Sequence, residues 1–491
     1  MHAVIQAKGY QGNETYVNPI LAGDYADPTV VRVGNDYYMT HSCFEFAPGF
    51  LIWHSTDLVN WEPIAKALTE YAGNVWAPDL VYYKGQFYIY APIDEEIMVL
   101  TAVQPTGPWS TPTKVGIRGI DPGHVADDDG NRYLFYGSGY VAELTPDGLS
   151  VKGAPRKVFN GWRFPEEWVV EGRFLESPKL TYHGGYFYLT VAQGGSSGPA
   201  TSHMVASARS KDPWGPYEDS PYNPIVRTQS RGERWLSKGH GSIVNTPDGD
   251  WWIIYHAYEK GYYTLGRQTL LEPLEWTEDG WFRIPEGVST SLPIRKPSGR
   301  VLYRSESFRE FQSESGDLGY AWSWYKPTSP IKYEVDRRTI TISSGSSSAP
   351  LVFMPKDHHY EAEVEIDISE KAASGRFVLF YNDKTYSGLE LSGEGVHGVI
   401  RGWRTPAKPW PSCHLIVRLQ YIWHEVIFYY SHDGKEWTKF EHSFETSGWH
   451  HNALGGFLAL RLALWAQGQG KVTFKNFDYH ALECDPECQT V

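Results

Sequence analysis

Residues 17 to about 284 carry a pattern of hydrophobic and polar positions that recurs five times. Each unit opens on a polar head residue beside Pro or Gly, passes a Gly or Asp turn, and ends in a run of aromatic and apolar residues. The head residues are Asp27, Asp79, Asp121, Glu176 and His240. Their intervals vary between 42 and 64 positions, which is too irregular for a linear solenoid. The pattern therefore predicts repetition around one axis.

Each unit is predicted to be a small antiparallel sheet. The head strand and the aromatic strand are followed by a further strand, clearest at Leu51–Ser55 and Met204–Arg209. Alternation with a period of two, and β-branched or aromatic content, favour strands over helices. Five such sheets in a ring make a five-bladed β-propeller, which we assign to residues 1–290.

A second domain is predicted after the propeller. Residues 285–299 are rich in Pro, Ser and Gly and show no periodicity, so we expect a linker there. Beyond it, Tyr360–Ile368 and Gly375–Tyr381 alternate as amphipathic strands do, and Ser431–Trp437 has the Asp-Gly turn of a hairpin. Residues 300–491 are therefore predicted to form a β-sandwich of the concanavalin-like jelly-roll type, which makes the whole chain all-β.

Composition narrows the range of partners. The net charge of −14 disfavours nucleic acid, and no apolar stretch is long enough to span a bilayer, so we expect no membrane partner. Aromatic residues make up 15% of the chain, and such rings can stack on sugars, although most single Trp residues are expected in the core.

The compartment is predicted from the N-terminus and the cysteines. The first residues lack a basic region followed by an apolar run, which favours the cytoplasm, or secretion if a leader has been trimmed away. The four cysteines make no disulfide framework. Cys484 and Cys488 could bind a metal, but a frayed tail is the stronger expectation.

The head residues carry the candidate chemistry. First strands of propeller blades line the central channel, so Asp27, Asp121 and Glu176 should converge at one end of it. Neighbouring carboxylates cannot all ionise cheaply, so one should stay protonated while another remains a base. Cleavage of a glycosidic bond needs that pair. The alternative makes the two aspartates strand-edge turn residues and Glu176 a hydrogen-bond partner between blades.

Five further residues are candidates around this channel. His240 could orient water or ligate an ion, or be purely structural, and no cluster with zinc-ligand spacing accompanies it. Arg267 could bind a sugar hydroxyl or a carboxylate, with a surface ion pair as the alternative. Trp76 is either a stacking platform or packing between blades, His203 is expected to face the sugar from loop 192–203, and Phe44 joins the predicted substrate contacts.

The ordered set of head motifs resembles glycoside hydrolase family 43, of the β-xylosidase and α-L-arabinofuranosidase type. The matching segments are Asn18-Pro19-Ile20, Ala26-Asp27-Pro28, Trp76-Ala77-Pro78-Asp79, Gly119-Ile120-Asp121-Pro122, Glu176-Ser177-Pro178, Gly239-His240-Gly241-Ser242 and Gly266-Arg267-Gln268. The resemblance implies that Asp27 is the general base, Glu176 the general acid and Asp121 the residue that tunes the pKa of the acid. It also implies a channel histidine at His240 with calcium or water, and a substrate-binding Arg267.

The resulting hypothesis is an inverting, exo-acting hydrolase that releases xylose from β-1,4-xylo-oligosaccharides. Inversion requires about 6.5–9.5 Å between acid and base, against about 5–5.5 Å for retention. An α-L-arabinofuranosidase acting on arabinoxylan or arabinan side chains is the close alternative, followed by a propeller that binds sugar without cleaving it and by a protein scaffold. The chemistry needs no cofactor, a structural calcium is an open expectation, and so is a homo-oligomer.

Overall fold

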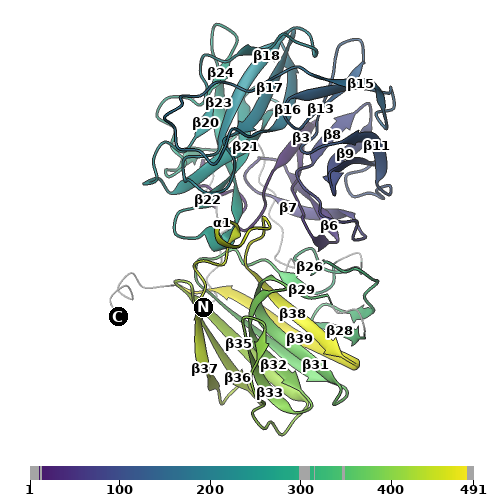
Figure 1. Cartoon of the computed structure of the whole chain (residues 1–491), viewed down its shortest axis with the longest axis vertical. Helices are drawn as coiled ribbons and strands as arrows, with labels where there is room; N and C mark the ends of the chain where they lie inside the picture. Colours follow the sequence, from purple (N-terminus) through teal and green to yellow (C-terminus); the bar gives the residue numbers. More distant parts are fainter. Residues whose placement is uncertain (1–9, 12–13, 298–309, 314–315, 346–348, 484–491) are drawn as a thin grey trace. The chain divides into compact units, whose positions relative to one another are not determined.

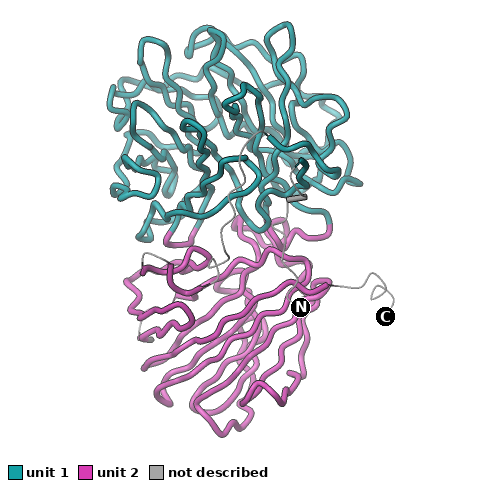
Figure 2. The backbone as a smooth tube through the Cα atoms, turned by 180° about the vertical axis from the view of Figure 1, so that it is seen from behind, with its two compact units in different colours: residues 1–44, 49–260, 267–304 teal, residues 45–48, 261–266, 305–491 magenta. Residues whose placement is uncertain are grey.

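The chain forms two compact units, each described here by itself (Figure 2). Unit 1 holds residues 1–44, 49–260 and 267–304, and unit 2 holds residues 45–48, 261–266 and 305–491. The structure, a computed structural model, describes residues 10–11, 14–297, 310–313, 316–345 and 349–483. Cys484 and Cys488 lie outside these residues. Two short stretches of the propeller region, 45–48 and 261–266, thus belong to unit 2, which the sequence did not predict.

Unit 1 is the predicted five-bladed propeller (Figure 1). Each blade is a sheet whose first strand is the innermost. From the inner strand outward, the blades are β3 (Thr29–Val33), β4 (Asp36–Thr40), β6 (Gly49–Ser55) and β7 (Glu62–Leu68); β8 (Asp79–Tyr83), β9 (Gln86–Ile93), β10 (Glu96–Ala102) and β11 (Thr113–Arg118); β12 (Gly123–Ala126), β13 (Arg132–Tyr136), β14 (Tyr140–Leu144) and β15 (Val151–Lys157); β16 (Leu175–His183), β17 (Tyr186–Gln193), β18 (Met204–Ser210) and β19 (Glu218–Asp219), with β20 (Val226–Arg227) also on β18; and β21 (Trp235–Asn245), β22 (Trp251–Glu259), β23 (Arg267–Trp276) and β24 (Phe282–Arg283).

The repeated turn glycines explain the recurrence of the pattern. Gly34, Gly85, Gly130, Gly185 and Gly249 all have positive φ, between 64° and 94°. A residue without Cβ adopts this conformation at no steric cost, so the head strand can reverse into the aromatic strand. The aromatic strands then fill the space between blades, where Leu134, Leu189 and Ile253 are fully buried.

The ring is closed by contacts between inner strands and by the N-terminal segment. Strand β3 contacts β8 on one side and β21 on the other. Strand β8 contacts β12, β12 contacts β16, and β16 contacts β21, which completes the ring. The Asn18 side chain donates to Leu271 O and accepts from Leu271 N, both at 2.9 Å. The segment before the first blade is therefore bonded to β23 of the last blade, so the two ends of the repeat are joined.

The predicted linker is partly ordered on unit 1, which corrects that expectation. Strand β25 (Ile294–Arg295) pairs with β2 (Thr15–Tyr16), which in turn pairs with β1 (Tyr10–Gln11). The Lys296 ammonium forms a buried ion pair with Asp57 at 3.1 Å. A two-residue strand has no periodicity to detect, which is why a Pro- and Ser-rich composition concealed it.

Unit 2 consists of two large sheets, as expected for a sandwich. In spatial order, one sheet holds β34 (Trp403–Arg404), β33 (Gly395–Ile400), β32 (Thr385–Ser392), β31 (Ala373–Asn382), β38 (Arg461–Gly468), β29 (Leu351–Phe353), β26 (Trp322–Tyr325) and β5 (Phe46–Ala47). The other holds β27 (Tyr333–Val335), β28 (Thr339–Ser344), β39 (Gly470–Ala481), β30 (Tyr360–Ile368), β35 (His414–Ile422), β36 (Glu425–Ser431) and β37 (Thr438–Glu445). Along β30 every second residue is buried, which confirms the predicted alternation.

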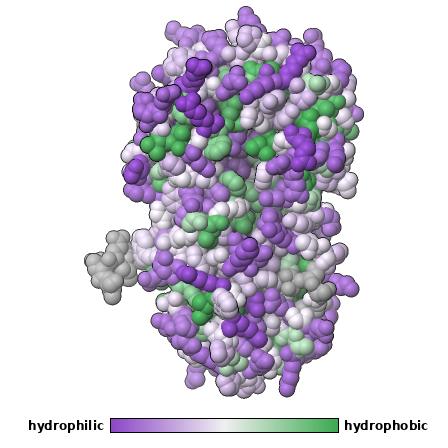
Figure 3. Space-filling view, viewed as in Figure 1, coloured by the Kyte–Doolittle hydropathy of each residue, from purple (hydrophilic) through white to green (hydrophobic). Residues whose placement is uncertain are grey.

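Helix is nearly absent from the residues that the structure describes. They contain the 3₁₀ turn η1 (Tyr263–Leu265) and the four-residue α1 (His451–Leu454). Within the same ranges, no helix has the length and apolar character needed to cross a membrane. Figure 3 shows apolar side chains, in green, set among polar ones on the visible face of the propeller unit.

Candidate active site

The starts of the inner strands have an unusual backbone conformation. Asp27, Asp121, Ser177 and His240 all have positive φ, at 58°, 53°, 55° and 59°. This left-handed conformation is uncommon for residues other than Gly, and it costs of the order of 1–3 kcal/mol each unless the surroundings enforce it. Strain of this kind clusters at functional sites. The conformation occurs at three of the five predicted head residues, Asp27, Asp121 and His240. It also occurs at Ser177, the residue after a fourth head, so it indicates a functional site at this end of the channel.

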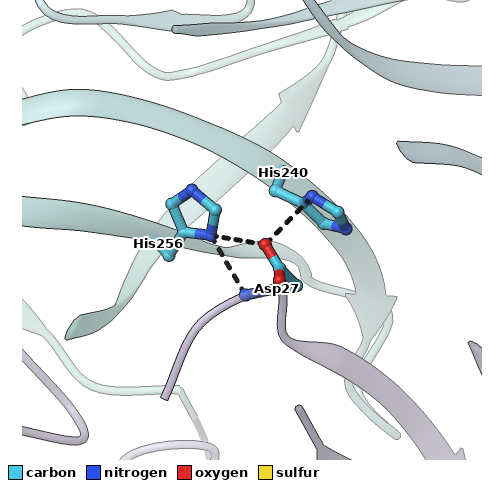
Figure 4. Close-up of side chains that lie close together, drawn as sticks. All are labelled: Asp27, His240 and His256. Carbon is cyan, nitrogen blue, oxygen red and sulfur yellow. Dashed lines mark hydrogen bonds and ion pairs between the residues drawn. The ribbon is translucent and has the colours of Figure 1, made fainter. Parts of the chain in front are cut away.

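Nitrogen atoms of three side chains surround the Asp27 carboxylate, and the Asp27 backbone N–H donates to one of them, His256 Nδ1, at 3.0 Å. Oδ1 of Asp27 is 3.1 Å from Arg267 Nη1, 3.3 Å from His240 Nδ1 and 3.2 Å from His256 Nδ1, as seen for the two histidines in Figure 4. Its Oδ2 accepts a hydrogen bond from the Ser42 hydroxyl. Burial alone would raise the pKa of Asp27, but Arg267, His240 and His256 outweigh it and hold the pKa well below its usual value. Asp27 is therefore ionised at neutral pH.

The pKa of Asp121 is shifted in the opposite direction. The carboxyl is buried, and its Oδ2 accepts a hydrogen bond from Ser177 N at 3.0 Å. Burial, and then the charges of Glu176 and Asp27, raise its pKa well above the usual value, against weaker opposition from Lys179 and the Ser177 N–H. The influence of both other carboxylates on Asp121 shows that the three predicted acids are close enough to interact.

Glu176 is the most accessible of the three acids. Its side chain is 24% exposed, whereas that of Asp27 is 8% exposed. Its Oε1 lies 3.2 Å from Nε2 of His203, which is fully buried. His203 therefore contacts the predicted acid, and its contact with a sugar remains a prediction.

A buried ion pair beneath the site joins four blades. Lys179 Nζ, from β16, donates to Asp79 Oδ1 at 3.0 Å, to Pro78 O at 2.7 Å and to Pro122 O at 2.9 Å. Asp79 also accepts from His124 N at 2.7 Å and from the Thr29 hydroxyl at 3.3 Å. Lys179 follows Glu176 by three positions and binds the carbonyl directly after Asp121, so this pair positions both acids.

Two of the other predicted substrate contacts, Arg267 and Phe44, lie next to each other. The Arg267 guanidinium lies 5.4 Å from the centre of the Phe44 ring, so these two candidates lie together beside Asp27. Trp76 is half-buried, and its backbone N–H donates to Pro92 O at 3.2 Å. Arg267 binds a carboxylate, the second of its two predicted roles, whereas stacking of a sugar on Trp76 or Phe44 remains a prediction.

One group of residues has the spacing of metal ligands. Single ligand atoms of Asp27, His240 and His256 all lie within 4.8 Å of one another. Calcium prefers six to eight oxygen ligands, whereas this group offers one carboxylate and two imidazoles. The positive Arg267 also lies on the same carboxylate oxygen and would repel a cation. The donor set does not fit the calcium expected at His240.

No role was predicted from the sequence for Ser42, His256 or Lys179, although Lys179 stands at the end of the motif that begins with Glu176. His256 sits in the apolar run Trp251–Glu259, and a buried histidine in such a strand is a signal that could have been followed. Burial lowers the pKa of His256 to about 3, against the smaller opposing effect of Asp27, so the ring is neutral at neutral pH. Ser42 and Lys179 carried no comparable signal, because their partners come from other parts of the chain.

Comparison with known proteins gives a consistent picture. A model of "Glycosyl hydrolases family 43" matches residues 16–282. The chain is 32% identical over 332 residues to a "Xylan 1,3-beta-xylosidase" of Vibrio sp, covering 58% of this chain and 60% of that protein. It is also 32% identical over 340 residues to a non-reducing end alpha-L-arabinofuranosidase of Bacteroides ovatus, covering 64% and 61%. The matches thus span about 60% of these relatives' lengths.

Solved structures extend the likeness over both units. The GH43 BlXynB protein from Bacillus licheniformis superimposes with a TM-score of 0.84 at 28% identity, covering 95% of this chain and 100% of the other. Xylan beta-1,4-xylosidase from Bacillus halodurans gives a TM-score of 0.82 at 25% identity, with 94% and 99% covered. With its five-bladed propeller, its ordered head motifs and the match over residues 16–282, the chain belongs to glycosyl hydrolase family 43.

Proposed function

We propose that this protein is an inverting, exo-acting glycoside hydrolase that releases xylose from β-1,4-xylo-oligosaccharides. The observation that carries the proposal is an ionised Asp27 near a pair of interacting carboxyls, Asp121 and the more accessible Glu176, in which burial and the neighbouring charges raise the pKa of Asp121. Single displacement needs one ionised and one protonated carboxyl at the same sugar. The β-xylosidase relatives and solved structures support xylose as the sugar.

In the proposed reaction, Asp27 takes a proton from a water molecule, and the water oxygen attacks the anomeric carbon. The bond from that carbon to the leaving oxygen breaks, and Glu176 gives its proton to the departing oxygen. Arg267, His240 and His256 keep Asp27 ionised, which makes it available as the base. Burial and the charge of Glu176 raise the pKa of Asp121, so these two carboxyls hold a proton between them instead of both ionising, and the proposed reaction delivers that proton from Glu176. The carboxyls carry out these steps without a cofactor.

An α-L-arabinofuranosidase is the second candidate, because the relative from Bacteroides ovatus with that name is 32% identical to this chain, as is the xylosidase from Vibrio sp. Hydrolysis of an aryl β-xyloside and an aryl α-L-arabinofuranoside, with the first-formed anomer followed by NMR, separates the two sugars and reports the stereochemistry. We expect the xyloside to be preferred and the product anomer to be inverted. Retention of the anomeric configuration would contradict the mechanism.

Glu176→Gln tests the acid. We expect kcat for xylobiose to fall by about 10²–10⁴-fold, because a poor leaving group needs its proton, while substrate binding is largely kept. Asp129→Asn, at an exposed carboxylate of the propeller, is the matched control and should behave as wild type. Full activity of Glu176→Gln on xylobiose would end the assignment.

A further inference from the structure

A half-exposed aromatic ring stands two positions before the predicted acid. Phe174 is 50% exposed, although Phe135 and Phe187 of the neighbouring blades are buried. It ends a connection, residues 158–174, that leads from blade three to the inner strand of blade four. Single exposed apolar residues are common on protein surfaces, so what distinguishes this ring is its place two positions before Glu176.

Side-chain alternation predicts that Phe174 and Glu176 lie on the same side of the chain. Side chains alternate along an extended strand, so positions 174 and 176 share a face and Leu175 has the opposite one. Leu175 pairs with Gln193 across β16 and β17, and its side chain packs against the hydrophobic core between blades three and four. The ring is therefore expected on the side of the strand that carries the acid.

Glycine backbone lies against one edge of the ring. A Cβ at Gly195 would lie 2.8 Å from Phe174 Cδ2, and a Cβ at Gly172 would lie 2.7 Å from Cε2. Glycine at these two positions lets the main chain approach the ring closely, and φ of +86° at Gly195 also favours glycine. One edge of the ring is packed in this way, whereas half of the side-chain surface stays exposed.

The segment that carries the ring is fixed in place. The Glu171 backbone N–H donates to Ser202 Oγ at 2.8 Å and to Gly194 O at 3.1 Å, and the Glu171 carboxylate accepts from Ser197 N at 2.8 Å. These bonds tie residue 171 to the glycine-rich loop 194–202. The segment that carries Phe174 is thereby preorganised, and preorganised groups lose less entropy when a ligand binds to them.

Three more rings stiffen the same connection. Phe164 stacks on Trp168 at 6.3 Å between ring centres, and Trp162 meets Trp168 edge-on at 5.9 Å. The Arg227 guanidinium covers Trp168 at 3.7 Å. These rings have aromatic or cationic partners within the protein, whereas half of the Phe174 surface faces solvent.

We propose that Phe174 is the stacking platform for the sugar ring of the leaving group, and so a specificity-determining residue of the proposed hydrolase. An acid that protonates the departing oxygen must face the leaving group, and Glu176 is the acid exposed to solvent. The C–H face of a pyranose fits a flat apolar ring, and binding sites for small molecules are commonly lined by such rings. The inference rests on the proposed function, because only the role of Glu176 as the general acid tells us that the leaving group lies on this side of the site.

Two substrates that differ only in the leaving group test this inference. Xylobiose leaves a sugar ring behind, whereas β-D-xylosyl fluoride leaves an ion with no ring. For Phe174→Leu, which keeps the apolar bulk and loses the flat ring, we expect kcat/KM for xylobiose to fall about five- to tenfold. Hydrolysis of the fluoride should stay within about twofold of wild type, and Phe174→Trp should retain activity on both substrates.

Tyr140→Ala removes a comparably exposed ring, 39% exposed, from β14 and is the matched control. An unchanged kcat/KM of Phe174→Leu on xylobiose overturns the platform. So does an equal loss on both substrates, or a loss that Tyr140→Ala shares. If the wild-type protein hydrolyses neither substrate, the proposed function itself fails, which is a different result from the failure of the platform alone.

Discussion

Asp27 and Asp121 are buried to the same degree, each 5% exposed, yet their surroundings move their pKa values in opposite directions. Asp27 faces a guanidinium and two imidazoles, whereas Asp121 faces two other carboxylates and the single ammonium of Lys179. Burial opposes the charged form of both, so the sign of each net shift is decided by neighbouring charge. At the scale of single residues, this division of protonation states is what makes acid–base chemistry available.

Removing the guanidinium should move the acidic limb of the pH profile. Arg267 lowers the pKa of Asp27, so in Arg267→Met the base should take up its proton at higher pH than in wild type. We expect the acidic limb of kcat/KM to shift upward, together with a loss of about tenfold or more at neutral pH. Arg283→Met, at a partly exposed arginine of β24, is the control. An unchanged acidic limb would show that Arg267 does not set the pKa of Asp27.

Neutralising Asp121 should stabilise the fold while it slows the reaction. The folded pKa of Asp121 is raised, so above the ordinary carboxyl value of about 3.9 the folded state loses stability as pH rises. Asp121→Asn removes this cost and can still accept the Ser177 N–H. We expect a higher Tm than wild type at pH 7, a gap that closes below about pH 4, and kcat lower by about 10². A lower Tm at pH 7 would contradict this account.

At the scale of elements, the inner strands carry both the chemistry and the connections between blades. Strands β12 and β16 approach so closely that a Cβ at Gly123 would lie 1.7 Å from Pro178 O. Directly beside this contact, Lys179 binds Asp79 and the carbonyl of Pro122. The strand that presents Glu176 is thereby held against the strand that follows Asp121.

The ion pair between Lys179 and Asp79 should show strong coupling. Lys179→Met leaves a buried carboxylate without its cation, and such a loss costs about 3–5 kcal/mol of unfolding free energy. In the double variant Lys179→Met/Asp79→Asn no buried charge is left alone, and the new amide oxygen can still accept the His124 N–H. Denaturant unfolding should therefore give a double variant clearly more stable than the sum of the single effects. Additivity within about 0.5 kcal/mol would refute the coupling.

At the scale of the whole molecule, the two units are interleaved along the sequence. Strand β5 pairs with β26 in a sheet of unit 2, although it lies between β4 and β6 of the first blade. Segment 261–266 is held in unit 2 by the bond between His424 Nε2 and Gly261 O at 2.6 Å, and by Leu460 N donating to Thr264 O at 3.1 Å. A single cut of the chain therefore cannot separate the units without leaving these segments unpaired.

A fragment of residues 1–304 should be less stable than the full chain. It lacks β26 and the Arg461 guanidinium, which lies 3.9 Å from the centre of the Phe46 ring, so β5 becomes an open edge. We expect a Tm lower by about 5 °C or more and increased dye binding to exposed apolar surface. The control is the full chain cleaved at a protease site inserted after residue 304, with both parts present. Equal Tm values for fragment and control would show that unit 2 does not support β5.

The repeat made much of the fold and the central acids predictable. Asp27, Asp121 and Glu176 stand at equivalent positions of equivalent units, so any closed ring brings them to one end of the channel. The partners of these acids were not predictable in the same way. Ser42, His256 and Lys179 occupy different positions in their blades, and which carboxyl each one meets depends on strand twist and on how the ring closes. The pairing of β25 and the place of segments 45–48 and 261–266 in unit 2 could not be predicted either, because strands of two residues are too short to show a periodic pattern.

The sequence by itself determined the alternation of strands, the five turns and the positions of the three candidate acids, because these are local features of side-chain period and of glycine placement. Only the tertiary structure decided which acid is ionised and which is protonated. A pKa depends on burial and on charges that lie hundreds of positions away along the chain, as Arg267 does from Asp27. That information exists only after the last blade has closed on the first.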